Sequence, residues 1–202
     1  MKTGPRYKIA KRLGASVFEK AQTQKFAIAQ ERTAKNKRRG RGPSGYGKQL
    51  LEKQKVRITY GVTERQFSNY VRKAMAAHGA SPVERLHGAL ELRLDNVAYR
   101  IGLAPTRRAA RQLTSHGHLT VNGRRTTIPS REMHPGDRLA VREGSKSRML
   151  FHDFEDRFME HPLPSWLSWN PKTMEGSVQE TPTMESADPA GDLTVVISFY
   201  SR

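Results

Sequence analysis

The spacing of apolar residues changes at Gly102, and this change limits the chain to a mixed α+β fold. Before Gly102, apolar side chains recur every three or four residues, which is the period of one helix face. After it, short β-prone runs are separated by turn residues. The clearest turn is Asn122-Gly123, which favours a two-residue hairpin because both residues tolerate positive φ. We therefore predict helices followed by a small antiparallel sheet.

Two helices with clear end signals are predicted first. The earlier one covers 48–60 and stops at Gly61, a glycine suited to the position just after a helix. The later one begins at a capping box formed by Thr63 and Gln66 and ends by Gly79. Their charged residues alternate with an apolar stripe, so each is expected to bury one face.

A third helix is predicted over 82–101. Ser81 supplies an N-cap, Pro82 occupies the first helical position, and Glu84 completes a second capping box. Apolar residues then follow at steps of three and four up to Ile101. We expect one uninterrupted helix.

The segment beyond Gly102 is predicted to contain a short helix and three strands. Thr106 is a plausible N-cap for a helix that reaches Leu113. Strands are expected at 119–121, at 124–128 and around 139–141, the last of them after a Pro-Gly-Asp turn. Two short helices packed on a small antiparallel sheet account for this pattern most economically.

The tail is expected to add less regular structure. An amphipathic helix is predicted from Leu150 to Phe158, then a mostly irregular middle, then a last β-prone strand over 193–200. Trp166 and Trp169 are interpreted as anchors that pack the tail onto the helical part, because the local charge is negative.

The charge of the chain is graded. Its formal net charge is +17, made up of +14 in residues 1–60, +9 in 61–150 and −6 in 151–202. Such an excess points to a polyanionic partner, and the acidic tail favours one oriented docking face. No apolar run approaches the roughly 18 residues of a membrane span, and no secretory signal is present, so we expect a cytoplasmic protein without a membrane partner.

Enzymatic and cofactor sites are not supported. With no cysteine, disulfides, thiolate nucleophiles and cysteine-bound zinc are excluded. The glycines of 40–48 have the spacing of nucleotide-binding loops. In such loops a buried strand leads the glycines to the helix N-terminus that meets the phosphate, and no strand precedes them here. His116 and His118 lack further metal ligands nearby. Three acids embedded in the basic middle are predicted to be ion-pair or capping partners rather than catalysts: Glu91, Asp95 and Asp137.

Three stretches carry a resemblance to a known family. The first is Tyr46-Gly47-x-Gln49-Leu50-x-Glu52-Lys53-Gln54-Lys55-Val56-Arg57. The second is Glu91-x-Arg93-Leu94-Asp95-Asn96-Val97, followed by Ala110-Arg111-Gln112-Leu113, Ser115-His116-Gly117-His118 and Val121-Asn122-Gly123. The third is the closing Phe199-Tyr200-Ser201-Arg202. Together they resemble the S-four family of small-subunit ribosomal proteins, of bacterial type.

The resemblance implies three parts. A basic N-terminal arm and connector would cover 1–44. A helical domain would combine 45–91 with the tail, 150–202. An S-four-type RNA-binding domain would be inserted at 92–149.

The resemblance also implies a function. The protein would be a structural constituent of the small ribosomal subunit and not an enzyme. It would bind a junction in the 5′ domain of small-subunit ribosomal RNA, nucleate assembly of the subunit body and contribute to translational accuracy. Its expected neighbours are the ribosomal proteins S-five and S-three, with mRNA close by where it enters, and it would need no cofactor.

Candidate RNA-binding residues follow from charge and from the resemblance. Side chains cannot enter the deep major groove of an RNA duplex, so a folded junction is bound through phosphates, 2′-hydroxyls and shape, which favours arginine and lysine on rigid elements. The predicted set is Arg6, Arg12, Lys37, Arg38, Arg39, Arg41, Tyr46, Gln49, Lys53, Lys55, Arg57, Arg65, Gln66, Arg72, Arg93, Arg107, Arg108, Arg111, Ser115, His116 and His118.

One departure from the family concerns the arm. Many members hold zinc there with four cysteines, and the resemblance places those positions on Tyr7, Ala10, Ala21 and Phe26. The chain is therefore similar to the zinc-free branch. We expect the arm to be ordered by packing, with Phe18, Phe26 and Ile28 as candidates, and by RNA contact.

Three other classes remain alternatives. A ribosome-rescue heat-shock protein could use the same small domain, but the helices before Gly102 and the chain ending disfavour it. A pseudouridine synthase would need a catalytic domain larger than the segment after 150. A nonspecific nucleic-acid packager is disfavoured by the acidic tail.

Overall fold

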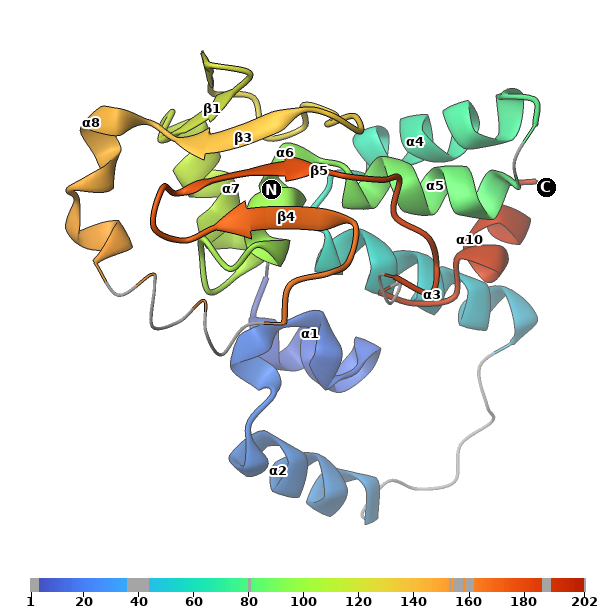
Figure 1. The fold of residues 1–202 in the computed structure, drawn as a ribbon. Coiled ribbons are helices and arrows are strands. Elements are labelled where there is room, and N and C mark those ends of the chain that lie inside the picture. The colour runs from blue at the N-terminus through green and yellow to red at the C-terminus, as the bar shows by residue number, and fades with distance from the viewer. Residues whose placement is uncertain are drawn as a thin grey trace. The chain divides into compact units, whose positions relative to one another are not determined.

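The chain forms two compact units in a computed structural model that describes residues 4–35, 44–79, 81–152, 154, 158, 162–186 and 190–201. The helical unit comprises Met1–Leu86 with Pro189–Arg202, and the sheet unit comprises His87–Asp188 (Figure 1). The predicted α+β fold is confirmed. Within the described residues, no helix is long and apolar enough to cross a membrane.

The two predicted helices of the helical unit are confirmed as α3 (Gly45–Thr59) and α4 (Glu64–Ala76). The first begins earlier than expected because the Ser44 side chain accepts a hydrogen bond from the Gly47 amide at 3.2 Å. Gly61 follows α3 with φ 64°, and Thr63 and Gln66 form the predicted capping box at the start of α4. Local end signals therefore fix both helices.

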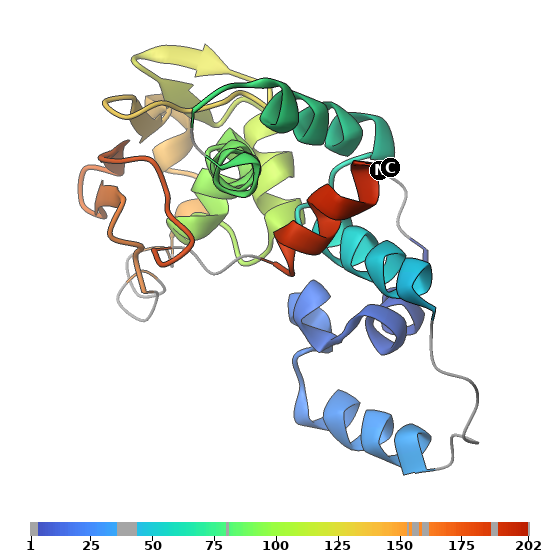
Figure 2. The ribbon, with the colours of Figure 1, turned by 90° about the vertical axis from the view of Figure 1, so that its right-hand side faces the viewer.

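The last β-prone run is a helix, α10 (Leu193–Tyr200), so the predicted strand is wrong. The Asp192 carboxylate caps this helix by accepting a hydrogen bond from the Val195 amide at 3.1 Å. Leu193 and Val196 are buried, and α10 lies along α3, as Figure 2 shows in red and cyan. Packing of one face against a neighbouring helix, together with the cap, outweighs the strand propensity of the β-branched residues.

The N-terminal arm folds as α1 (Arg6–Leu13), two 3₁₀ turns (Ala15–Val17 and Glu19–Ala21) and α2 (Gln24–Lys35). A small apolar cluster holds it together. The cluster consists of buried Ala10, Ala21 and Phe26, with Phe18 packed against them and the Tyr7 ring stacked on Phe26 at 5.9 Å. The four positions on which the resemblance placed the zinc-binding cysteines thus meet in an apolar cluster. Ile28 is 51% exposed and takes no part, contrary to prediction.

Replacing Phe26 with alanine is expected to open the arm. Phe→Ala substitutions in cores lower the free energy of unfolding by about 3–5 kcal/mol. We expect this loss to exceed the stability that so small a cluster gives the arm. We expect amide hydrogen-exchange protection in α1 and α2 to fall to that of exposed chain, while α4 keeps its protection. Ile28→Ala serves as the control and should change nothing. Unaltered protection of α1 and α2 in the Phe26 variant would contradict a role for the cluster.

The helix predicted over 82–101 is interrupted, forming α5 (Pro82–Glu91) and α6 (Leu94–Arg100). Backbone hydrogen bonds to the segment 129–133 cause the break. The Met133 amide donates to the Leu92 carbonyl at 2.8 Å, and the Leu94 amide donates to the Arg131 carbonyl at 2.8 Å. These bonds replace the helical ones, a tertiary effect that apolar spacing alone does not reveal.

In the described residues, the sheet unit contains a five-stranded antiparallel sheet in the order β2-β1-β3-β5-β4, in which β4 is Leu167–Asn170 and β5 is Glu175–Val178. The predicted strands appear as β1 (Leu119–Val121), β2 (Arg124–Thr126) and β3 (Arg138–Val141), after α7 (Arg107–Ser115). The predicted Asn-Gly turn is confirmed, with both residues at positive φ. Beyond β3 follow α8 (Glu143–Lys146) and the 3₁₀ turn η3 (Met149–Phe151).

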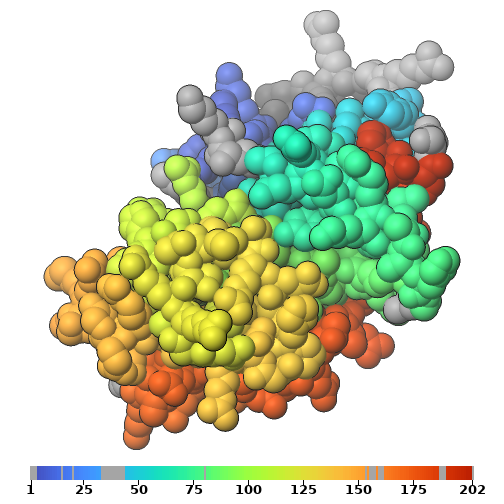
Figure 3. All heavy atoms as spheres, turned by 90° about the horizontal axis from the view of Figure 1, so that it is seen from above, coloured from blue at the N-terminus to red at the C-terminus, as the bar shows by residue number. Residues whose placement is uncertain are grey.

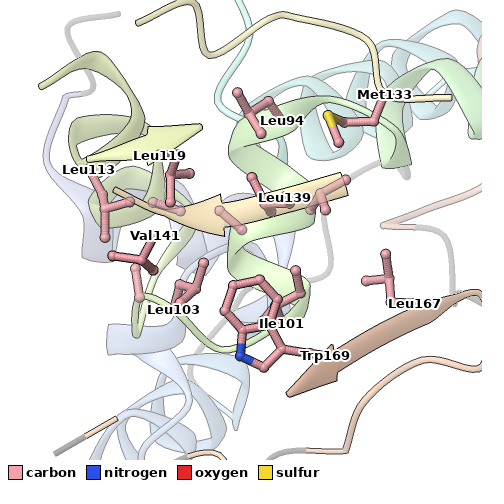
Figure 4. Packing of buried hydrophobic residues seen from close by; sticks show 14 of the residues in the cluster. Leu94, Ile101, Leu103, Leu113, Leu119, Met133, Leu139, Val141, Leu167 and Trp169 are labelled. Atoms are coloured by element: carbon pink, nitrogen blue, oxygen red, sulfur yellow. The ribbon is translucent and has the colours of Figure 1, made fainter. Parts of the chain in front are cut away.

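The middle of the tail belongs to this sheet, which corrects the assignment of 150–188 to the helical domain. It forms a hairpin of β4 (Leu167–Asn170) and β5 (Glu175–Val178), and β5 pairs with β3. Trp166 and Trp169 are 1% and 7% exposed in the core of the sheet unit rather than on the helical part. Figure 4 shows Trp169 among the core side chains near Ile101. Of the predicted helix at 150–158, the first two residues belong to the 3₁₀ turn η3, and residues 153 and 155–157 lie outside the described residues.

Candidate nucleic-acid interface

Helix α7 carries the predicted arginines, and its first turn is fixed by an N-cap. The Thr106 side chain caps it by accepting a hydrogen bond from the Ala109 amide at 3.1 Å, as expected. The Arg107 guanidinium lies 4.4 Å from the centre of the Tyr99 ring, and its Nε donates to Asn96 Oδ1 at 2.9 Å. Arg107 is therefore held in one orientation before any ligand binds.

Arg111 is held by a buried carboxylate. Asp95 is 3% exposed and accepts a hydrogen bond from the Nε of Arg111 at 2.7 Å. The same carboxylate accepts two from Arg93, at 3.1 and 3.0 Å. Arg93 itself is only 2% exposed, so it acts as an internal partner of Asp95 and, contrary to prediction, is not part of the exposed basic surface.

Glu91 organises a second buried network. It is fully buried and accepts hydrogen bonds from both Nε and Nη2 of Arg100 at 2.8 Å. Its Oε2 also accepts from Asn96 Nδ2 at 2.9 Å, and Asn96 in turn accepts from Arg107. The prediction that Glu91 and Asp95 pair with arginines is confirmed. Two internal carboxylates thus orient two arginines near the surface.

Other predicted residues continue this surface at the end of α7. Arg108, Ser115 and His116 are exposed, and the Ser115 hydroxyl donates to the Arg111 carbonyl at 2.7 Å. His118 differs because it is buried, with Nδ1 3.0 Å from the Ser145 hydroxyl. The turn therefore carries one exposed and one buried histidine.

Sequence reasoning missed three arginines that gather at this end of the sheet unit, namely Arg125, Arg142 and Arg148. Their charges all act on His118. Signals pointed to two of them: an Arg-Arg pair directly after the hairpin turn includes Arg125, and the alternation of β3 directs Arg142 away from buried Val141. None pointed to Arg148. The yellow surface in Figure 3 contains the hairpin and β3 of this region.

In the helical unit, the predicted cations converge on Glu64. Its carboxylate lies 2.7 Å from Lys53 Nζ and 3.3 Å from Arg57 Nη1, and it accepts a hydrogen bond from the Tyr200 hydroxyl at 2.8 Å. Burial alone would raise the pKa of Glu64, but the bonds from Lys53 and Tyr200 and the nearby cations outweigh it and lower the pKa. Burial and the Glu64 carboxylate raise the pKa of Tyr200. Lys53 also lies 4.6 Å from the centre of the Phe199 ring, so it holds α10 in place.

The remaining predicted residues of the helical unit are more dispersed. Arg12, Tyr46, Arg65, Gln66 and Arg72 are exposed. Arg6, Gln49 and Lys55 are partly buried; Gln49 donates to Ser198 at 3.3 Å, and Lys55 lies 3.8 Å from Glu52. The predicted Lys37, Arg38, Arg39 and Arg41 lie outside the described residues.

Metal chemistry finds no support in the geometry. Across the described ranges, no group of three or more histidine, aspartate or glutamate side chains could hold a metal ion. Asp137, predicted as an ion-pair or capping partner of a neighbouring arginine, caps the turn instead: its carboxylate accepts hydrogen bonds from the His134 amide at 2.9 Å and from the Asn122 side chain at 2.7 Å.

The α+β fold and its preoriented arginines define a polyanion-binding protein. Residues 1–94 match the family described as ribosomal protein S4/S9 N-terminal domain, and residues 92–139 match the S4 domain. Small ribosomal subunit protein uS4 of Roseiflexus castenholzii is 43% identical over 205 residues, covering 98% of each chain. The same-named protein of Latilactobacillus sakei is 39% identical over 203 residues, covering 99% of this chain and 98% of its own. The chain belongs to the uS4 family of small ribosomal subunit proteins.

Proposed function

We propose that the chain is a structural constituent of the small ribosomal subunit that binds small-subunit ribosomal RNA and acts in the cytoplasm. The preoriented arginines of α7 carry this proposal. Arg107 and Arg111 are fixed by Asn96 and Asp95, and guanidinium forks of fixed direction suit paired phosphate oxygens. Family membership supports a structural rather than an enzymatic role.

The RNA target we propose is the junction in the 5′ domain, whose binding would nucleate assembly of the subunit body and support accurate translation. The test compares a 5′-domain transcript with a scrambled RNA of equal length at several salt concentrations. A preference of about 10³ or more at physiological salt, within the range of specific recognition, is expected. Equal binding of both RNAs, collapsing as salt rises, would reduce the protein to a generic polyanion surface.

A triple variant tests the α7 surface directly. Replacing Arg107, Arg108 and Arg111 with alanine should weaken binding and flatten its salt dependence. Each lost contact between a cation and a phosphate lowers the slope of log affinity against log salt concentration by about 0.7–0.9. Filter binding between 50 and 300 mM salt measures the slope, with Lys172→Ala on the exposed β4–β5 turn as the control. An unchanged slope in the triple variant would place the RNA elsewhere.

For protein neighbours we propose S-five and S-three, with mRNA close by where it enters the subunit. Family membership supports this proposal. Chemical cross-linking of assembled small subunits through the exposed lysines of this chain tests it. Cross-links to S-five and S-three are expected, and cross-links only to other proteins would overturn it.

A further inference from the structure

A cluster of cations surrounds His118 at one end of the sheet unit. Arg125 belongs to β2, Arg142 directly follows β3, Arg148 lies between α8 and η3, and His116 ends α7. All four act electrostatically on the His118 imidazole. The chain thus brings three arginines and two histidines from four separate segments to one place. We call this group the His118 cluster.

The cluster is built around specific hydrogen bonds. His118 Nδ1 lies 3.0 Å from Ser145 Oγ, and the Arg142 Nε donates to the same oxygen at 3.4 Å. The Arg142 amide donates to the His118 carbonyl at 2.8 Å. These contacts fix the imidazole beside the Arg142 guanidinium. His118 keeps 7% of its surface exposed, and Phe151 packs against its ring with the centroids 6.5 Å apart.

Gly117 leaves space for the Arg125 side chain of the cluster. Its φ of +72° belongs to the left-handed region, and a Cβ built there would collide with the Arg125 guanidinium. The Nη2 of Arg125 donates to the His116 carbonyl at 3.3 Å, across the same turn. The absence of a side chain at Gly117 therefore allows a guanidinium to lie over the turn that carries both histidines.

The three arginines lack acidic partners in the described part of the chain. None of the ion pairs found there includes Arg125, Arg142 or Arg148. The nearby acid Glu143 is engaged with Lys146 at 2.6 Å. Cations held this close without a counter-charge repel one another, and an anion bound among them would relieve that repulsion.

We propose that Arg125, Arg142 and Arg148 bind a backbone phosphate of the RNA, and that His118 takes up a proton when this phosphate binds. The inference rests on the proposed function, because RNA supplies the phosphate. In the free protein, burial and then the charges of Arg148, His116, Arg142 and Arg125 lower the pKa of His118 below its usual value of 6.5. A bound phosphate offsets those charges and raises this pKa again.

The sign of the pH effect follows from this linkage. Between the pKa of the free protein and the higher pKa of the complex, binding RNA takes up a proton, so the affinity rises as the pH falls. Below the free-state pKa, His118 is charged in both states and the dependence ends. Each unit by which the two pKa values differ corresponds to a tenfold change in affinity.

The first test measures affinity for the 5′-domain transcript from pH 5 to pH 8 with the full chain. We compare the wild type with His118→Gln, which keeps a hydrogen-bonding group near Ser145, and with His78→Gln, an exposed histidine outside the cluster. The wild type and the His78 variant should gain tenfold or more in affinity at low pH. His118→Gln should lose most of that gain. If it retains the full gain, proton uptake by His118 is wrong.

The second test addresses the phosphate contact. Arg142→Gln combined with Arg148→Gln should reduce the slope of log affinity against log salt concentration by about 0.7–0.9, the value for one lost phosphate contact, whereas Lys172→Gln should leave it unchanged. An unchanged slope in the double variant would overturn the phosphate site. The preference for intact over scrambled RNA, measured at pH 7, tests the proposed function separately. If the protein prefers the intact RNA but shows neither the pH effect nor the change in salt slope, this inference is wrong and the proposed function stands.

Discussion

Replacing Asp95 with asparagine is expected to lower the free energy of unfolding of the sheet unit by about 3–5 kcal/mol, the usual cost of breaking a buried ion pair. The carboxylate is 3% exposed, and Arg93, which it neutralises, is 2% exposed. Asparagine is nearly the same size but carries no charge. The Arg93 guanidinium would then remain buried without its counter-charge.

Urea unfolding followed by tryptophan fluorescence measures this destabilisation, because both tryptophans lie in the core of the sheet unit. A double variant, Arg93→Met with Asp95→Leu, is the informative control. Removing both charges leaves no buried ion unpaired, so it should cost clearly less than Asp95→Asn alone. If the single variant unfolds at the same urea concentration as the wild type, Asp95 does not stabilise the fold.

Replacing Trp169 with alanine is expected to cost the sheet unit a similar amount, about 3–5 kcal/mol. The indole is 7% exposed and meets the Phe154 ring edge-on, with the centroids 6.1 Å apart. It ties the β4–β5 hairpin to a core that includes α6 and α7. Removing the indole should therefore loosen the last two strands first.

Trp169→Phe provides the matched control. In the described structure, the indole Nε1 is buried without a hydrogen-bond partner, so removing it sacrifices no bond and the phenyl ring keeps much of the packing. The phenylalanine variant should retain most of the stability, as judged by far-UV circular dichroism in urea. Equal destabilisation by alanine and phenylalanine would show that reduced packing is not the cause.

The fold could be predicted wherever local chemistry decides the outcome. The capping box at Thr63, the glycine after α3 and the Asn-Gly turn each satisfy backbone groups within a few residues, and all three are confirmed. Predictions were wrong where distant partners decide. The segment 129–133 interrupts the long helix, and α3 gives the β-prone run 193–200 a helical packing partner.

The candidate site was only partly predictable for the same reason. The arginines of α7 stand out by charge and spacing. The sequence does not show that Arg93 is buried in an ion pair with Asp95. Nor does it show that Lys53 forms an ion pair with Glu64 and contacts the Phe199 ring. It also hides the His118 cluster, whose members are scattered from 116 to 148 and meet only once the hairpin and β3 have paired.

The hydrogen bond between Tyr200 and Glu64 joins residues 136 positions apart. At synthesis rates of about 5–20 residues per second, α3 and α4 wait roughly 7–27 s for α10 to be made. The sheet unit, whose strands and helices all lie between them, can complete its folding during that interval. Its compaction shortens the chain that α10 must close and so reduces the entropic cost of closure. In a newborn chain we therefore expect the inserted unit to mature first and the surrounding one to close last.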